Sequence, residues 1–167
     1  MSRYDSFYGK VTNISNFYMK QQNYEGCYKI LTLQNNETIV NFIMAPFTFL
    51  VDYDSISVGD FAVGFYDGMA PALTIYPPQY QAIVMTKDKP YQNVKVDTFD
   101  SNLVSSDGQL KLNVTSDTKI IMQNGQEFTD SITDKTLVVV FGATTRSIPA
   151  QTTPYYIVVL CKWLQIS

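Results

Sequence analysis

The sequence predicts an all-β protein, because apolar-alternating runs and tight-turn dipeptides recur along its 167 residues and no helical period is visible. The segments Val94–Phe99 and Leu110–Val114 alternate apolar and polar residues, which is the period-two pattern of half-buried strands. Leu137–Phe141 and Ile157–Cys161 are continuously apolar and too short for helices, so we expect strands that are covered on both faces. At most a short turn of helix is expected.

Glycine-containing dipeptides lie where hairpins need tight turns. Asp107-Gly108 separates Leu103–Val104 from Leu110–Leu112. Asn124-Gly125 follows the apolar run Ile120–Met122. Both dipeptides tolerate the positive φ angles of short hairpin turns, so a reversal of the chain is predicted at each place.

These signals occur in the same order in the two halves of the chain, Tyr8–Met85 and Asn93–Leu160. The matching segments are Lys10–Ile14 and Val94–Phe99, Tyr28–Leu33 and Leu110–Val114, Thr48–Val51 and Thr118–Ile121, Phe61–Tyr66 and Leu137–Phe141, and Ala82–Met85 and Ile157–Leu160. A repeat of this length predicts two similar modules, 8–86 and 92–162, that form one fused unit. The linker Lys87–Gln92 is too short to let them move independently.

Each half contains about five expected strands, punctuated by Gly, Pro and Asn. This pattern predicts a tandem repeat of two small Greek-key barrels of the oligonucleotide/oligosaccharide-binding (OB) type, packed as a pseudo-twofold pair. In such a barrel a long connection precedes the last strand, and ligands often dock beside it.

Charge and composition exclude several classes of function. Twelve basic residues and a net charge of −3 argue against nucleic-acid binding, which needs clustered Lys and Arg to neutralise phosphates. The chain has no histidine, the commonest general base and metal ligand. Asp52, Asp54 and Asp60 lie close together, but the glycine bend and closing Glu of a calcium loop are missing, so we interpret them as turn caps. The sequence therefore predicts no enzyme, metal or cofactor.

No apolar run is long enough to span a membrane, and Met1–Lys10 lacks the basic and apolar regions of a signal peptide. We therefore expect a cytoplasmic protein without membrane insertion. Cys27 and Cys161 fall on expected strands beside apolar neighbours, so buried free thiols are the first interpretation. A disulfide between these two cysteines is the alternative.

The most unusual segment is the aromatic, proline-rich connection Gly64–Tyr80, whose counterpart is Phe141–Tyr155. Aromatic rings and a few polar groups suit the binding of a sugar or a peptide. The candidate ligand-binding residues are Tyr66, Asp67, Tyr76, Tyr80 and Arg146. A competing hypothesis is structural: these connections fold back over an open barrel edge that would otherwise invite aggregation.

The segments Gly64–Asp67, Ile75–Tyr80 and Thr145–Pro154 resemble an uncharacterised β-rich protein family of clostridia and related Firmicutes. Some members look like secreted proteins joined to a copper-amine-oxidase N-terminal-like domain, a wall-associated module despite its name. We expect this chain to lack both the signal and that extra domain. The resemblance supplies no catalytic residue, and it implies a coat or cell-surface setting.

The leading functional prediction is a non-enzymatic structural or assembly protein that forms homo-oligomers in a coat or surface layer. Abundant tyrosine adds rigid contact area, and the modest net charge leaves little repulsion to oppose association. Deposition on a spore or cell surface would follow from the resemblance. The alternative is a glycan- or peptide-binding module that uses its aromatic loops.

Overall fold

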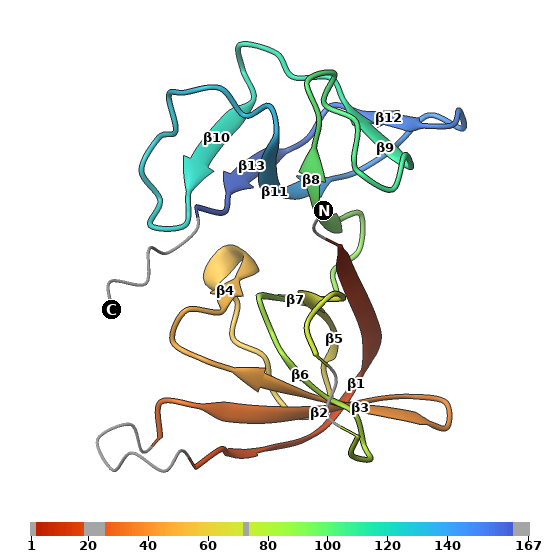
Figure 1. The fold of residues 1–167 in the computed structure, drawn as a ribbon, viewed down its shortest axis with the longest axis vertical. Coiled ribbons are helices and arrows are strands. Elements are labelled where there is room, and N and C mark those ends of the chain that lie inside the picture. The colour runs from red at the N-terminus through yellow and green to blue at the C-terminus, as the bar shows by residue number, and fades with distance from the viewer. Residues whose placement is uncertain (1–2, 19–25, 72–73, 162–167) are drawn as a thin grey trace. The chain divides into compact units, whose positions relative to one another are not determined.

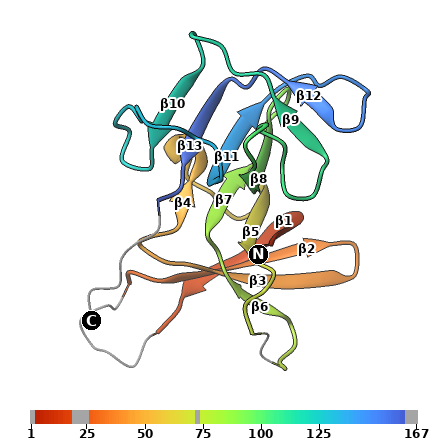
Figure 2. The same ribbon diagram turned by 45° about the horizontal axis from the view of Figure 1, so that its top comes forward.

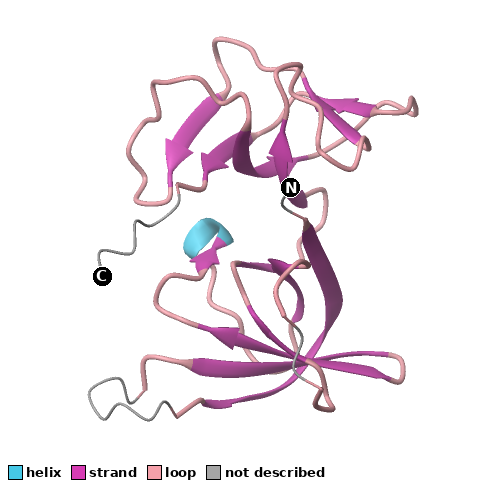
Figure 3. Ribbon diagram, viewed as in Figure 1, coloured by secondary structure: helices cyan, strands magenta, loops and turns pink. Residues whose placement is uncertain are grey.

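The computed structural model describes residues 3–18, 26–71 and 74–161, and it confirms the predicted all-β class (Figure 3). Within these ranges helix is confined to one 3₁₀ turn, η2 (Val51–Tyr53). The chain divides into two compact units, Met1–Asp88 and Lys89–Ser167. The boundary between them falls within the stretch that we expected to be the linker.

The first unit is one sheet of seven strands in the order β4-β7-β5-β1-β2-β3-β6 (Figure 1). Its strands are β1 (Tyr4–Asn16), β2 (Lys29–Asn35), β3 (Thr38–Met44), β4 (Phe49–Leu50), β5 (Phe61–Asp67), β6 (Gln79–Gln81) and β7 (Val84–Lys87). The β1–β2, β2–β3, β1–β5 and β5–β7 pairs are antiparallel, whereas β3–β6 and β4–β7 are parallel.

Strands β6 and β7 are two parts of one path along the chain, interrupted only at Ala82 and Ile83 (Figure 2). The Ala82 N–H donates to the carbonyl of Ile43 on β3, and the Ile83 N–H donates to the carbonyl of Phe65 on β5. The path therefore pairs with β3 at one end and with β5 at the other. Hydrogen bonding runs through β1, β2, β3, β6–β7 and β5 and back to β1.

The long strand β1 serves two neighbours. Its first half, Tyr4–Lys10, pairs with β5, and its second half, Lys10–Asn16, pairs with β2. The register shifts between Val11 and Asn13, and such a bulge bends the strand. The bend allows one strand to take part in both halves of the circuit.

The core of the first unit gathers on the inner side of these strands. Its buried apolar residues are Val11, Leu31, Leu33, Val40, Phe42, Ala62, Ala82 and Met85. Phe42 is the largest fully buried side chain among them. A Cβ atom on Gly64 would lie 2.6 Å from the Phe42 ring, so glycine at this position lets the ring lie against the backbone of β5.

The second unit contains a four-stranded sheet, in the order β10-β13-β11-β8, and a two-stranded parallel pair, β12-β9. Its strands are β8 (Asn93–Phe99), β9 (Leu110–Leu112), β10 (Lys119–Met122), β11 (Lys135–Phe141), β12 (Ala150–Thr152) and β13 (Tyr156–Val159). Leu137–Val140 and Ile157–Val159 are buried throughout, which confirms that most of each predicted run is covered on both faces, although Phe141 and Leu160 are half-buried and Cys161 is exposed.

The two units use the same pairings. Strands β8, β11 and β13 pair antiparallel as β1, β5 and β7 do, and β10 joins β13 in parallel as β4 joins β7. The turns before β4 and β10 also agree. In both, the first residue (Ala45 or Thr115) donates its N–H to the hydroxyl of a threonine three positions later (Thr48 or Thr118).

One predicted correspondence between the halves is wrong. We expected Leu110–Val114 to match Tyr28–Leu33, which is the region of β2, but β9 pairs in parallel with β12 as β3 pairs with β6. The place of β2 is taken by a short turn, in which Val104 bridges Lys111 and Ser105 bridges Phe99. The second unit therefore has the circuit of the first with one strand reduced to a stub. The turn at Asp107-Gly108 that produces this stub was predicted.

A buried carboxylate holds the stub in place. Asp97 is only 5% exposed, and it accepts hydrogen bonds from the Thr98 N–H, the Ser106 hydroxyl and the Asp107 N–H. Asp107 in turn accepts from the Lys95 ammonium at 2.6 Å. Side-chain bonds therefore replace some of the backbone ladder that a longer hairpin would supply.

The interpretation of the cysteines as buried is wrong, because both thiols are free and exposed. Cys27 lies in a turn before β2, and Cys161 follows the end of β13. Apolar neighbours misled the prediction because β2 begins only after Cys27 and β13 ends before Cys161. Among the described residues there is no helix of the length and apolarity that crossing a membrane requires.

Candidate functional site

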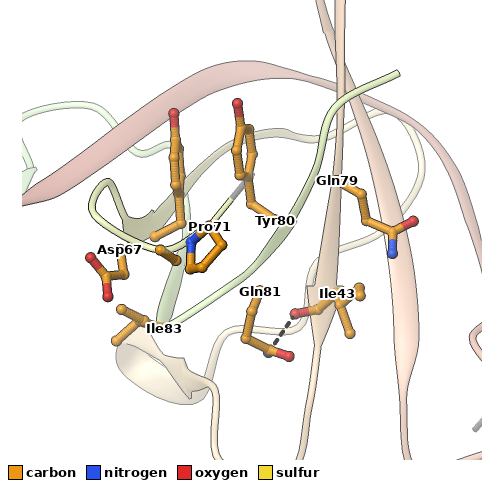
Figure 4. A pocket seen from close by; sticks show the side chains of 9 residues that line it. Ile43, Asp67, Pro71, Gln79, Tyr80, Gln81 and Ile83 are labelled. Atoms are coloured by element: carbon orange, nitrogen blue, oxygen red, sulfur yellow. Dashed lines mark hydrogen bonds between the residues drawn. The ribbon is translucent and has the colours of Figure 1, made fainter. Parts of the chain in front are cut away.

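The first unit has a hollow of about 410 Å³ at the place where β5 and β6 separate (Figure 4). Strands β3, β5 and β6 and the segments next to them supply its wall. The lining residues are Ile43, Tyr66, Asp67, Ala70, Pro71, Gln79, Tyr80, Gln81 and Ile83. The wall is largely apolar, with one carboxylate, two amides and two phenols at its polar positions.

Two tyrosines form the aromatic side of the hollow. The rings of Tyr66 and Tyr80 are stacked with centroids 3.8 Å apart and planes 11° apart. The buried ring of Phe42 contacts both of them, at 5.9 and 6.2 Å between centroids. Burial, followed by the neighbouring Tyr80, raises the pKa of Tyr66 to about 12. The Phe42 ring therefore supports both tyrosine rings. Because its pKa is raised, Tyr66 remains a neutral phenol at physiological pH.

The polar edge of the hollow is anchored to the start of β1. Asp67 Oδ1 accepts a hydrogen bond from the Met69 N–H, and the Asp67 carbonyl accepts one from the Ala70 N–H. Arg3 donates to the carbonyl of Gly68 at 2.9 Å and forms an ion pair with Asp5 at 3.0 Å. These bonds set where the connection leaves β5 and keep the carboxylate of Asp67 at the rim.

The two glutamines of β6 differ in what their side chains do. The Gln81 amide donates to the carbonyls of Ile43 and Ala82, so its position is fixed (Figure 4). The Gln79 side chain lines the hollow without a hydrogen bond to another described residue. It is therefore available to a ligand.

The structure brings together three of the five predicted ligand residues, Tyr66, Asp67 and Tyr80. Tyr76 is 77% exposed and does not line the hollow. Arg146 belongs to the second unit, in a connection fastened by bonds among Thr145, Ser147 and Pro149. The predicted set is thus divided between two units.

Sequence reasoning missed the two glutamines and Ile43. These residues line the hollow because β6 pairs in parallel with β3, two strands that lie far apart in the sequence. The alternation of Gln79, Tyr80 and Gln81 was the available signal, since it indicates a strand with polar residues on one side. Its partner strand is not readable from periodicity.

Of the acidic residues that we interpreted as turn caps, Asp60 does cap a turn. Asp60 Oδ2 accepts a hydrogen bond from the Ser57 N–H, and Lys87 lies 3.4 Å from Asp60 and 3.9 Å from Asp54. The Ser57 bond, together with Lys87, lowers the pKa of Asp60. In the part of the chain that the structure describes, no group of three His, Cys, Asp or Glu residues is arranged to hold a metal ion.

Comparison with known proteins gives no relative from which a function can be carried over. No family model, curated protein or solved structure matches the chain. The functional argument therefore depends on the strand order and on the hollow beside Tyr66 and Tyr80.

Proposed function

We propose that the chain is a non-enzymatic binding module built from two OB-like Greek-key barrels, and that the first barrel holds a glycan or peptide beside Tyr66 and Tyr80. The observation that carries the proposal is the hollow itself, whose lining combines a stacked aromatic pair with the polar side chains of Asp67 and Gln79. Rigid aromatic faces with a few polar groups are the usual composition of small binding sites.

The strand order supports the OB-like assignment of the first unit. Three consecutive antiparallel strands, β1, β2 and β3, are followed by β5, which returns to β1, and by β6–β7, which lies between β3 and β5. A five-stranded, partly open barrel of this kind binds ligands on its strand face and at its loops. The hollow lies beside the connection between the fourth and fifth strands of that circuit.

Binding is tested with two probes, an array of oligosaccharides and a displayed library of random heptapeptides. Probes that bind are titrated into the protein while amide NMR shifts and the melting temperature are recorded, because a ligand stabilises the native state by mass action. Tyr80→Ala is expected to abolish binding, whereas Tyr76→Ala is the matched control, since Tyr76 is an exposed tyrosine outside the hollow. If neither probe binds, or if both variants bind equally well, the proposal is wrong.

Self-association in a coat or surface layer is the second candidate. It is favoured by an exposed aromatic pair on the first unit: Tyr8 and Phe61 stack with centroids 5.8 Å apart and are 42% and 46% exposed. Exposed aromatic contact area of this kind is enriched at interfaces. Light scattering over a concentration series tests this candidate. Growth of a defined oligomer that is lost in a Tyr8→Ser, Phe61→Ser variant would support it, and a monomer at every concentration would exclude it.

A further inference from the structure

The outward edge of β6 carries backbone groups that the sheet does not use. The Asn41 N–H donates to the Pro78 carbonyl, and the Ala82 N–H donates to the Ile43 carbonyl. In a parallel ladder alternate residues face the same neighbour, so Tyr80 also turns its N–H and carbonyl to β3. Gln79 and Gln81 therefore turn theirs away from β3, toward the hollow.

These outward groups have no backbone partner among the described residues. Strand β5 pairs with β7 only as far as Phe65, opposite Val84, and it does not pair with β6. The edge of β6 thus opens onto the hollow rather than onto a neighbouring strand. An unpaired strand edge is a template for pairing with another segment of chain.

The second unit shows what covers the equivalent edge. Val84 and Tyr156 hold the same position, because each pairs with the strand before it and with the short parallel strand beside it. Gln79 precedes Val84 by the same number of positions as Gln151 precedes Tyr156, so Gln151 is the equivalent of Gln79. Both residues are glutamines on the strand that pairs in parallel with β3 or β9.

In the second unit this edge is occupied by Thr145, through its backbone N–H and its hydroxyl group. The Thr145 N–H donates to the Gln151 carbonyl at 2.9 Å, and the Gln151 N–H donates to Thr145 Oγ1 at 2.9 Å. Counted from the paired residues Val140 and Phe65, Thr145 corresponds to Ala70 in the first unit. The Ala70 N–H instead donates to the carbonyl of Asp67, and Ala70 lines the hollow.

We propose that the outward edge of β6 binds an extended peptide segment of a partner protein, whose backbone pairs with Gln79 and Gln81 as Thr145 pairs with Gln151. This proposal rests on the proposed binding function and specifies its ligand. The added strand places one side chain in the hollow. Ile43 and Ile83 provide apolar contact for it, and Asp67 disfavours an acidic side chain.

A proline substitution separates backbone recognition from side-chain recognition. Gln79→Pro removes the outward N–H together with the amide side chain, and proline is tolerated at the first residue of a strand with that N–H unpaired by the sheet. Gln79→Ala keeps the N–H and removes the side chain. Heptapeptides selected on the wild-type protein are synthesised, and their affinity is measured by fluorescence anisotropy.

We expect Gln79→Pro to weaken peptide binding about tenfold or more beyond the loss that Gln79→Ala produces, because only the proline variant also removes the backbone N–H. Gln151→Pro is the matched control in the second unit and should leave affinity unchanged. Two peptides are compared, one N-methylated at its odd-numbered amides and the other at its even-numbered amides. Only the peptide whose methyl groups point away from β6 should bind, and this tests the proposal even if Gln79→Pro does not fold.

The outcomes distinguish this proposal from the one on which it rests. Equal losses for Gln79→Pro and Gln79→Ala, or no effect of N-methylation in either phase, would overturn strand addition. If the peptide library yields no binder but oligosaccharides bind at Tyr80, the proposal of a peptide ligand is wrong and the proposal of a binding module stands. If neither class of probe binds, both proposals are wrong.

Discussion

The connection between β5 and β6 and its counterpart between β11 and β12 differ in how they treat the outward backbone edge of the next strand. The first has eleven residues, 68–78, and leaves the backbone of Gln79 without a described partner. The second has eight residues, 142–149, and closes the edge through Thr145. The comparison teaches that a small change in loop length and sequence converts a capped strand edge into one that borders a hollow.

A second difference lies in the core beneath the edge. In the first unit Phe42 on β3 faces Gly64 on β5, whereas the equivalent positions of the second unit are Leu112 and Val139. The large Phe42 ring fits because Gly64 has no side chain, whereas the smaller Leu112 leaves room for the side chain of Val139. The two facing positions thus keep a similar total volume in both units. The ring of Phe42 supports Tyr66 and Tyr80, and the second unit has no such aromatic pair at Thr152.

The largest effect is expected from placing the second unit's residue in the first. Gly64→Val should destabilise the protein by about 3 kcal/mol, because the new side chain enters the space of the Phe42 ring. Adding Phe42→Leu should recover part of that loss. Urea unfolding followed by circular dichroism measures both variants, and additivity of the two changes would contradict the exchange of volume.

Removing the carboxylate that holds the stub should affect only the second unit. Asp97→Ala is expected to cost about 2 kcal/mol, since the Thr98 and Asp107 N–H groups and the Ser106 hydroxyl lose their acceptor. Hydrogen exchange read by mass spectrometry should show faster exchange in 97–112. Asp100→Ala, which removes bonds to an exposed carboxylate in the next turn, is the control with a smaller effect.

Opening the closed edge of the second unit should cost less. Thr145→Val removes the hydroxyl that accepts from the Gln151 N–H, and it should destabilise the protein by about 1 kcal/mol. Amide exchange at Gln151 should accelerate while exchange at Gln79 stays as in wild type. An unchanged rate at Gln151 would show that the hydroxyl does not protect this edge.

The smallest effect is expected from acid. Partial burial raises the pKa of Asp107, but its bonds with Lys95, Ser105 and Gln109 outweigh burial and lower the pKa below 3.8. A lowered folded-state pKa contributes stability that is present above the unfolded value and is lost as pH falls through the folded value. Asp107→Asn should therefore flatten the acid limb of the stability curve below about pH 4. Asp67→Asn is the control, and an equal flattening by both variants would contradict the assignment to Asp107.

The sequence predicted those features that depend on neighbouring residues. Period-two runs, the reversals at Asp107-Gly108 and Asn124-Gly125, and the buried runs of β11 and β13 follow from local pattern, and the structure contains all of them. The order of the repeated signals also anticipated which strands of the two halves correspond, apart from β9. Tyr66, Asp67 and Tyr80 were chosen for their chemistry, and they line one hollow.

What could not be predicted depends on pairing between distant segments. The parallel contact of β3 with β6 brings Gln79 beside the hollow, and no local signal specifies it. The same holds for Thr145, whose hydroxyl looks like that of any loop threonine until its bond to Gln151 is known. Cys27 and Cys161 were misjudged because each lies just outside its expected strand, before the start of β2 at Lys29 or after the end of β13 at Val159.

The reduction of one hairpin to a stub also bears on how each unit folds. In the first unit β2 and β3 pair from Asn35 and Thr38 outward, a local contact that forms with little loss of chain entropy. Both units contain a ladder between distant segments, in which Tyr4 pairs with Asp67 and Val94 pairs with Val140, but in the second unit the stub leaves that ladder without a full local hairpin to precede it. We expect the first unit to acquire structure earlier during synthesis, and the second to have the higher contact order and the slower folding phase.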